Sequence, residues 1–146
     1  MSGKLDPWEC RRWSSASVNT AEIVRSETRP IFHIRNQQAD NRTLWRTVPL
    51  EPFRNYVLSA EIKTRDVKIT EKGGKFGAHL AANGSRTPWR LEGTRDWTPV
   101  SVCFTTGSKA SGVEINLGLG GFASVAQGEV WFRDVQFRKV HYPVED

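Results

Sequence analysis

The sequence predicts an all-β fold, a single antiparallel β-sandwich of jelly-roll type. Three observations support this prediction. Apolar residues recur at every second position, as expected of strands with one buried face. Clusters of Gly, Pro, Asn, Asp and Ser interrupt these runs at intervals of roughly 8–15 residues, a spacing typical of sandwiches and barrels. The 146 residues have room for one core, so we expect one domain over residues 1–146 without a substantial helix.

The first third of the chain contains four short segments with strand character. Polar residues interrupt their alternation, but their spacing along the chain is that of neighbouring strands. Leu50-Glu51-Pro52 closes the last segment, because proline cannot donate to a strand ladder. The four predicted strands are Arg11–Ala16, Ala21–Glu27, Ile31–Arg35 and Thr43–Leu50.

The clearest alternation in the middle of the chain is Tyr56–Thr64. Leu58 and Ile62 face one side of this predicted strand, and Glu61 faces the other. Turn sequences rich in glycine and asparagine bound the shorter segments that follow. These segments predict two further strands, Phe76–Ala82 and Pro88–Glu92.

Three more strands complete the predicted sandwich. In the second of them, Ile115 and Leu117 oppose the polar Glu114 and Asn116. In the last, the alternation changes phase at Arg133-Asp134, which predicts a β-bulge. The three strands are Val100–Thr106, Val113–Gly120 and Glu129–Phe137.

The composition excludes several classes of protein. The 21 Lys and Arg residues outnumber the 16 Asp and Glu residues, for a net charge of +5, but they are scattered, so we expect no nucleic-acid partner. No apolar run is long enough to span a membrane. The two cysteines, Cys10 and Cys103, exclude a cysteine-based zinc site and leave open a disulfide or two free thiols.

Four motifs in the second half of the chain follow one another in a recognisable order. They are PLEPFRNYVLSAEIK (residues 49–63), GTRDWTPVSVCFT (93–105), VEINLGLGG (113–121) and GEVWFRDV (128–135). Together they resemble the galactose-binding-like β-sandwich of xylan- and glucan-binding modules attached to glycoside hydrolases, over about residues 43–138. The resemblance implies a non-catalytic carbohydrate-binding module, linked to other domains in a larger secreted or cell-surface protein.

The resemblance also implies a structural calcium ion. Such modules carry an acidic residue after an early aromatic one, and Trp8-Glu9 matches that place. They often have two adjacent aspartates in the last strand, where this chain has Arg133-Asp134. Glu9 and Asp134 are therefore the candidate calcium ligands. The alternative is that Asp134 forms a surface ion pair with an arginine.

The candidate sugar-binding residues follow from the same resemblance. In that fold Tyr56–Thr64, Phe76–Ala82 and Val113–Gly120 form a concave sheet, whose outward residues line the groove. Trp89 with Arg90 adds an indole for the apolar face of a sugar and a donor for its hydroxyls. The predicted site is Glu61, His79, Trp89, Arg90 and Asn116.

Other readings of these residues stay open. The polar residues can be the solvated face of a half-buried sheet, in a structural or protein-interaction domain. Glu61 and Glu114 can form a glycosidase pair, since hydrolysis needs two carboxylates about 5–10 Å apart. Trp97 is expected to anchor the core, and Trp131 to point outward beneath the N-terminal segment. The 14 arginines suggest an acidic polysaccharide as one ligand.

Overall fold

The computed structural model describes residues 8–12, 18–25, 29–69, 76–82, 85–121 and 124–140. These residues contain ten strands and no helix, and each predicted segment overlaps one strand, so the all-β prediction is confirmed. The strands are β1 (Glu9–Arg12), β2 (Thr20–Arg25), β3 (Pro30–Asp40), β4 (Arg42–Pro49), β5 (Asn55–Ile69), β6 (Ala78–Ala82), β7 (Ser85–Leu91), β8 (Gly93–Thr105), β9 (Gly112–Leu119) and β10 (Ala126–Val140).

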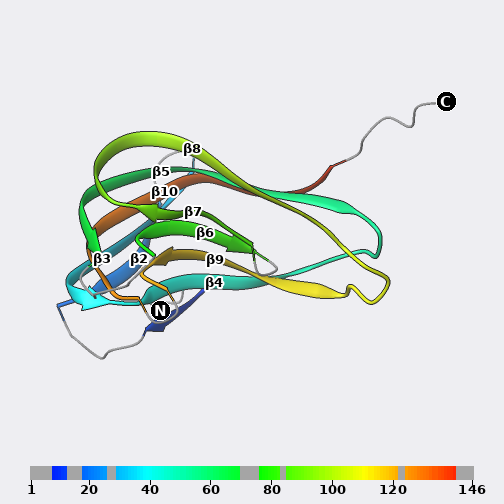
Figure 1. Ribbon diagram of the computed structural model, residues 1–146, viewed down its shortest axis with the longest axis horizontal. Coiled ribbons are helices and arrows are strands. Elements are labelled where there is room, and N and C mark those ends of the chain that lie inside the picture. Colours follow the sequence, from blue (N-terminus) through cyan, green and yellow to red (C-terminus); the bar gives the residue numbers. More distant parts are fainter. Residues whose placement is uncertain are drawn as a thin grey trace.

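The strands form two five-stranded sheets that pack face to face (Figure 1). Sheet A has the order β1-β4-β9-β6-β7, and sheet B has the order β2-β3-β10-β5-β8. Every pairing within these sheets is antiparallel. The architecture is therefore the predicted sandwich. In the described part of the chain, no helix is long and apolar enough to cross a membrane.

The core lies between the two sheets and consists mainly of alternate residues of the longer strands. Leu44, Leu80 and Leu117 contribute from sheet A, and Ile62 and Phe132 from sheet B, all with 0% of their surface exposed. Burying a large apolar side chain stabilises a fold by about 1.5–3 kcal/mol. This gain fixes which face of each strand points inward. The intervening residues line the two outer faces, where ligands have access.

The predicted bulge in the last strand is present. The register between β10 and β5 shifts between Arg133 and Gln136, and Asp134 has a φ of 55°. The extra residue restores the inward phase, so that Val135 and Phe137 pack against the core. The phase change in the sequence therefore marks a real irregularity of the backbone.

The described tryptophans lie partly in the core and partly on the outer faces of the sandwich. Trp8 is 8% exposed, and its ring meets Phe32 edge-on at 4.9 Å between centroids. The prediction that Trp97 anchors the core is wrong. Thr98 pairs with the inward Ile62, so Trp97 points to the outer face of sheet B. Trp13 lies outside the described residues.

Trp131 points outward from sheet B, as alternation predicts. Its ring stacks on His33 at 4.8 Å, with 12° between the ring planes. The Lys63 ammonium lies 5.6 Å from the ring centroid. Neighbouring strands of sheet B thus flank this indole. The expected cover from the N-terminal segment stays a prediction, because residues 1–7 and 13–17 lie outside the described residues.

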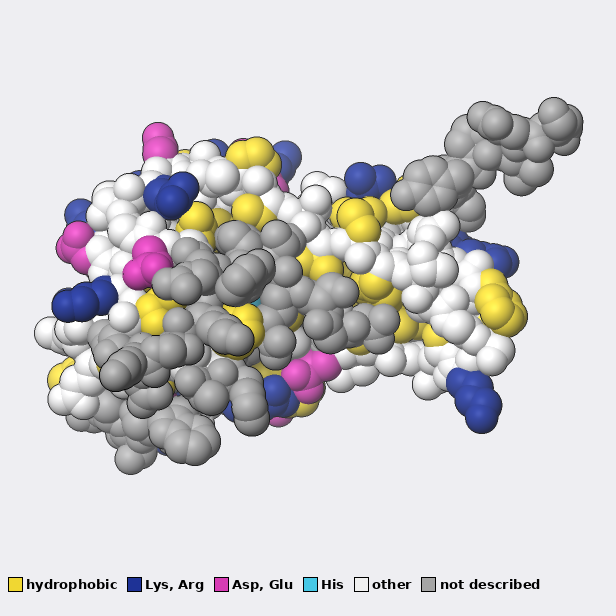
Figure 2. Space-filling model, viewed as in Figure 1, with side chains coloured by type: hydrophobic (Ala, Val, Ile, Leu, Met, Phe, Trp, Pro, Cys, Tyr) yellow, Lys and Arg dark blue, Asp and Glu magenta, His cyan; other side chains and the backbone are white. Residues whose placement is uncertain are grey.

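Both cysteines are free and exposed, one in each sheet. Figure 2 shows Lys and Arg side chains spread over the visible face rather than gathered into one block. This distribution agrees with the scatter of basic residues along the sequence.

Candidate functional site

The predicted site residues are divided between the two sheets. His79 lies on β6 and Asn116 on β9, which are neighbours in sheet A. Trp89 and Arg90 lie on β7, the next strand of the same sheet, but their side chains are outside the described residues. Glu61 lies on β5 in sheet B. The prediction that Tyr56–Thr64 shares a sheet with the other site strands is therefore wrong.

Glu61 has a partner of its own on the outer face of sheet B. Its Oε1 accepts a hydrogen bond of 2.6 Å from Nε of Arg133. The Arg133 guanidinium in turn covers the ring of Trp97, at 4.0 Å from the centroid. Glu61 thus belongs to an ion-pair and cation–π cluster on this face.

The suggested catalytic pair of Glu61 and Glu114 is wrong on geometric grounds. Glu61 points outward from sheet B, and Glu114 points outward from sheet A. Packed sheets are about 10 Å apart, and the two carboxylates lie on opposite outer faces of the sandwich. No glycosidic bond can be reached by both.

The outer face of sheet A gathers a different set around one indole. Trp45 on β4 is directly opposite Asn116 on β9, and it is half-buried. The Arg11 guanidinium from β1 lies 4.8 Å from the centroid of the Trp45 ring. Glu114 stands two residues from Asn116 on the same face. We call Arg11, Trp45, Glu114 and Asn116 the Trp45 face.

Arg11 and Glu114 are joined by two parallel hydrogen bonds. Nη1 donates to Oε2 at 2.9 Å, and Nη2 donates to Oε1 at 3.0 Å. These bonds hold the pKa of Glu114 below its ordinary value, with a further contribution from a hydrogen bond of Asn116, while burial acts in the opposite direction. The same pair raises the pKa of Arg11. Near neutral pH the face therefore presents a charged, oriented pair beside an indole.

His79 packs against the sheet and is only 4% exposed. Its ring lies over Gly118, where an added Cβ would stand 2.6 Å from Cε1 of the imidazole. Nδ1 lies 3.2 Å from the Gly77 carbonyl oxygen, and the Phe76 ring is 5.6 Å away between centroids. The imidazole ring of His79 itself occupies the space that Gly118 leaves on the neighbouring strand. A role for His79 in ligand binding stays a prediction.

The two candidate calcium ligands lie on strands of different sheets. Glu9 pairs with Trp45 at the edge of sheet A, whereas Asp134 sits on the bulge of sheet B and forms an ion pair with Arg29. Among the described residues, no group of three or more His, Cys, Asp or Glu is placed to hold a metal ion. Calcium prefers six to eight oxygen ligands. The ion pair between Asp134 and Arg29 matches the alternative given for Asp134, and binding of a calcium ion stays a prediction.

Trp45 and Arg11 are the residues of the Trp45 face that sequence reasoning passed over. Leu44 and Val48 face the core, so alternation alone would have placed Trp45 outward. Arg46 obscures this alternation, because it is a charged residue on the same inward side as Leu44 and Val48. Its guanidinium lies over the ring of Trp8, 5.9 Å from the ring centroid. A charged residue at an inward position breaks the pattern that identifies a strand face.

Solved structures with a similar fold include three carbohydrate-binding modules. A family 4 module superimposes with a TM-score of 0.58 at 15% identity, covering 91% of this chain and 86% of that one. The family 61 module TmCBM61, solved with β-1,4-galactotriose, gives 0.61 at 15% identity, covering 94% and 92%. A family 16 module gives 0.52 at 17% identity, covering 92% of each chain. This chain has the fold of the β-sandwich carbohydrate-binding modules.

The likeness to these carbohydrate-binding modules concerns the fold, since fewer than one residue in five is identical. No family model matches the sequence. The tRNA nuclease WapA of Bacillus subtilis (strain 168) is 30% identical over 100 residues, which are 64% of this chain. The tRNA3(Ser)-specific nuclease WapA of Bacillus spizizenii matches equally well. The chain spans about 4% of the length of these relatives.

Proposed function

We propose that this chain is a non-catalytic carbohydrate-binding module and that the Trp45 face is its sugar-binding surface. One observation carries the proposal. A half-buried indole on the outer face of sheet A is ringed by oriented polar groups, with Asn116 directly opposite it and the paired Arg11 and Glu114 beside it.

The chemistry of this face suits a saccharide. Sugar rings present apolar C–H faces that pack on an indole, while their hydroxyls need fixed donors and acceptors. The amide of Asn116 offers both, the carboxylate of Glu114 accepts, and the guanidinium of Arg11 donates. Arg11 already lies over the indole, so it must either shift or share the ring when a sugar binds.

Two further facts support a binding role in place of a catalytic one. The solved structures with this fold include binding modules, one of them in complex with a galactotriose. The carboxylates that could have formed a hydrolytic pair lie on opposite faces. Trp89 and Arg90 belong to β7, two strands from Asn116 in the same sheet, and we propose that they extend the surface.

We propose that residues 1–146 act as one module of a longer, extracellular protein. The support is the match to about 4% of a much longer bacterial chain, together with the fold of modules whose ligands are glycans. The nuclease activity named for that relative is not assigned to this module, because the match covers so little of its length.

Affinity electrophoresis against a panel of neutral polysaccharides tests the proposal, beginning with β-1,4-galactan, xylan and mixed-linkage glucan. We expect at least one of them to retard the parent protein. Trp45→Ala should weaken that binding by about tenfold or more, equal to about 1.4 kcal/mol. Trp97→Ala is the matched control, because it removes a half-buried indole from the opposite face.

Two results would count against the proposal. Retardation of no glycan would favour a structural or protein-interaction domain. An equal loss of binding in both variants would show that Trp45 contributes no more to glycan binding than Trp97 does.

A further inference from the structure

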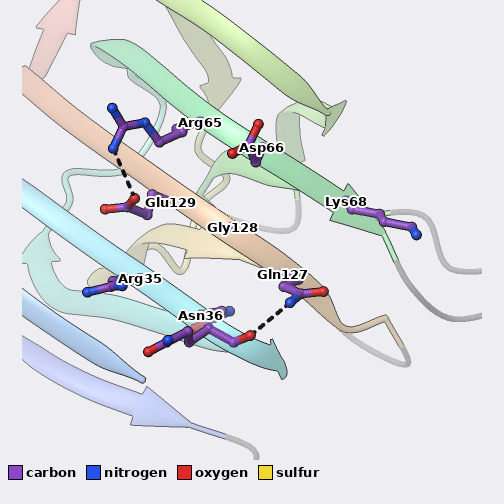
Figure 3. Close-up of a pocket in the computed structure, with 9 residues that line it drawn as sticks. Arg35, Asn36, Arg65, Asp66, Lys68, Gln127, Gly128 and Glu129 are labelled. Atoms are coloured by element: carbon purple, nitrogen blue, oxygen red, sulfur yellow. Dashed lines mark hydrogen bonds and ion pairs between the residues drawn. The ribbon is translucent and has the colours of Figure 1, made fainter. Parts of the chain in front are cut away.

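A second surface, on the opposite side of the sandwich, has its own chemistry. At one end of the outer face of sheet B, a shallow depression of about 370 Å³ opens where β3, β10 and β5 run side by side (Figure 3). Its floor is the main chain at Gly128, and its cationic side chains are Arg35, Arg65 and Lys68. We call it the Arg35 groove.

The groove exists because of an irregularity in β10. Gly128 has a φ of 122°, which disfavours any residue with a side chain. A Cβ at this position would stand 2.6 Å from the main-chain oxygen of Asp66. The register against both neighbouring strands shifts at this point. The main chain of β10 at Gly128 thus lies close to the main chain of β5 at Asp66. The floor of the groove at this point carries no side chain.

The strand register sets the spacing of the cations. Arg35 and Arg65 flank Glu129 on the two neighbouring strands, so their strands are about 10 Å apart. Glu129 is already engaged, at 3.7 Å from Arg65 and 2.9 Å from Nε2 of His33. None of the ion pairs between described residues includes Arg35 or Lys68. Their positive charges are available to a ligand.

The groove continues toward an aromatic region. Arg65 also lines a second depression of about 420 Å³, whose wall includes Lys63 and Trp131. The two depressions share this side chain, so an extended ligand can follow the face from Lys68 to Trp131. Such a length suits a polymer of several units better than a single ion.

The carboxylates within the groove indicate which polymer fits. Asp66 and Glu129 lie among the cations, and Trp131 is flanked by His33 and Lys63. A nucleic-acid backbone would bring dense phosphate charge against these carboxylates, and it would find no free indole for base stacking. An acidic sugar polymer carries both kinds of group, anions for Arg35 and Lys68 and hydroxyls that donate to Asp66 and Glu129.

We propose that the Arg35 groove binds a polysaccharide whose sugars carry carboxylate or sulfate groups. Arg35 and Lys68 hold the acidic groups, Arg65 bridges the two depressions, and the bare main chain at Gly128 lets the sugar backbone approach. The site is separate from the Trp45 face, so it goes beyond the proposed function and gives the module a second ligand.

The test uses the full chain with polygalacturonate and chondroitin sulfate as probes. The Arg35→Ala/Lys68→Ala variant removes two cations from the groove. The matched control, Arg54→Ala/Lys109→Ala, removes two exposed cations from the turns at the far ends of β5 and β8. Both variants are checked for unchanged unfolding temperature before binding is measured.

We expect the groove variant to bind at least one acidic probe roughly threefold to tenfold more weakly than the parent, because an exposed ion pair contributes modestly. The control variant and Trp45→Ala should bind it like the parent. Binding should also weaken as salt is raised from about 0.01 M to about 0.15 M, where the Debye length falls from about 30 Å to about 8 Å.

Three results would overturn the inference. The first is that the parent protein binds neither polygalacturonate nor chondroitin sulfate. The two double variants could lose affinity equally, which would indicate an unspecific effect of net charge. A tRNA probe could bind through Arg35 and Lys68 while the acidic polysaccharides do not, which would assign the groove to nucleic acid.

Discussion

Replacing Gly118 with alanine tests whether His79 is a packing residue of sheet A. A Cβ at this position would lie 2.6 Å from Cε1 and 2.8 Å from Nε2 of the imidazole. His79 is 4% exposed, so its ring cannot swing freely into solvent. Overpacking of a buried site typically costs about 1–3 kcal/mol. For a domain of this size, that cost lowers the unfolding temperature by roughly 3–10 °C.

The same strand supplies the control for Gly118→Ala. A Cβ on Gly112 would stand 3.4 Å from the main-chain oxygen of Val48, an ordinary contact. Gly112→Ala should therefore be neutral or stabilising by up to about 1 kcal/mol, since alanine restricts the unfolded chain. Differential scanning calorimetry of the two variants measures the contrast. If Gly118→Ala unfolds at or above the temperature of Gly112→Ala, His79 does not pack as described and its assignment must be reopened.

Two further predictions concern exposed interactions. In the folded chain the pKa of Glu114 is lowered, first by its hydrogen bonds with Arg11. The stability that this pair contributes is therefore present above the ordinary carboxyl pKa of about 4.3, and it is lost as the pH falls through the lowered pKa. Glu114→Gln should thus melt below the parent at pH 7 and level with it near pH 2, and a gap that persists in acid would contradict the pairing. Trp97→Ala should stay folded, and its free energy of unfolding should fall by less than the roughly 3–5 kcal/mol that replacing a core aromatic costs. A circular-dichroism spectrum typical of an unfolded chain would instead indicate that Trp97 packs in the core.

The strands could be predicted because each has one buried face. Apolar residues at every second position mark that face, as in Val113–Gly120, and a change of phase marks the bulge at Asp134. The sheet to which a strand belongs leaves no such mark. Tyr56–Thr64 and Val113–Gly120 alternate in the same way but lie in opposite sheets, so Glu61 was grouped with Asn116 on the wrong face.

Contacts between strands explain the position of two side chains, Trp97 and His79, that the sequence pattern alone did not place. Trp97 is turned outward by its register against β5 and is covered by Arg133 from β10, a partner far away in the sequence. His79 is buried because Gly118 on the neighbouring strand leaves room for its ring. Neither contact can be deduced from local pattern, since both depend on which strands pair and in which register.

The central claim is that a sugar contacts the indole of Trp45. The most direct measurement is a two-dimensional NMR spectrum of the tryptophan indole N–H groups, assigned by single replacements and recorded during titration with oligosaccharides of the retained neutral glycan. We expect the Trp45 indole signal to shift in a saturable manner, while the signals of Trp97 and Trp131 on the opposite face stay in place. A saturable shift confined to Trp97 or Trp131, or no shift of Trp45 at any sugar concentration, would contradict it.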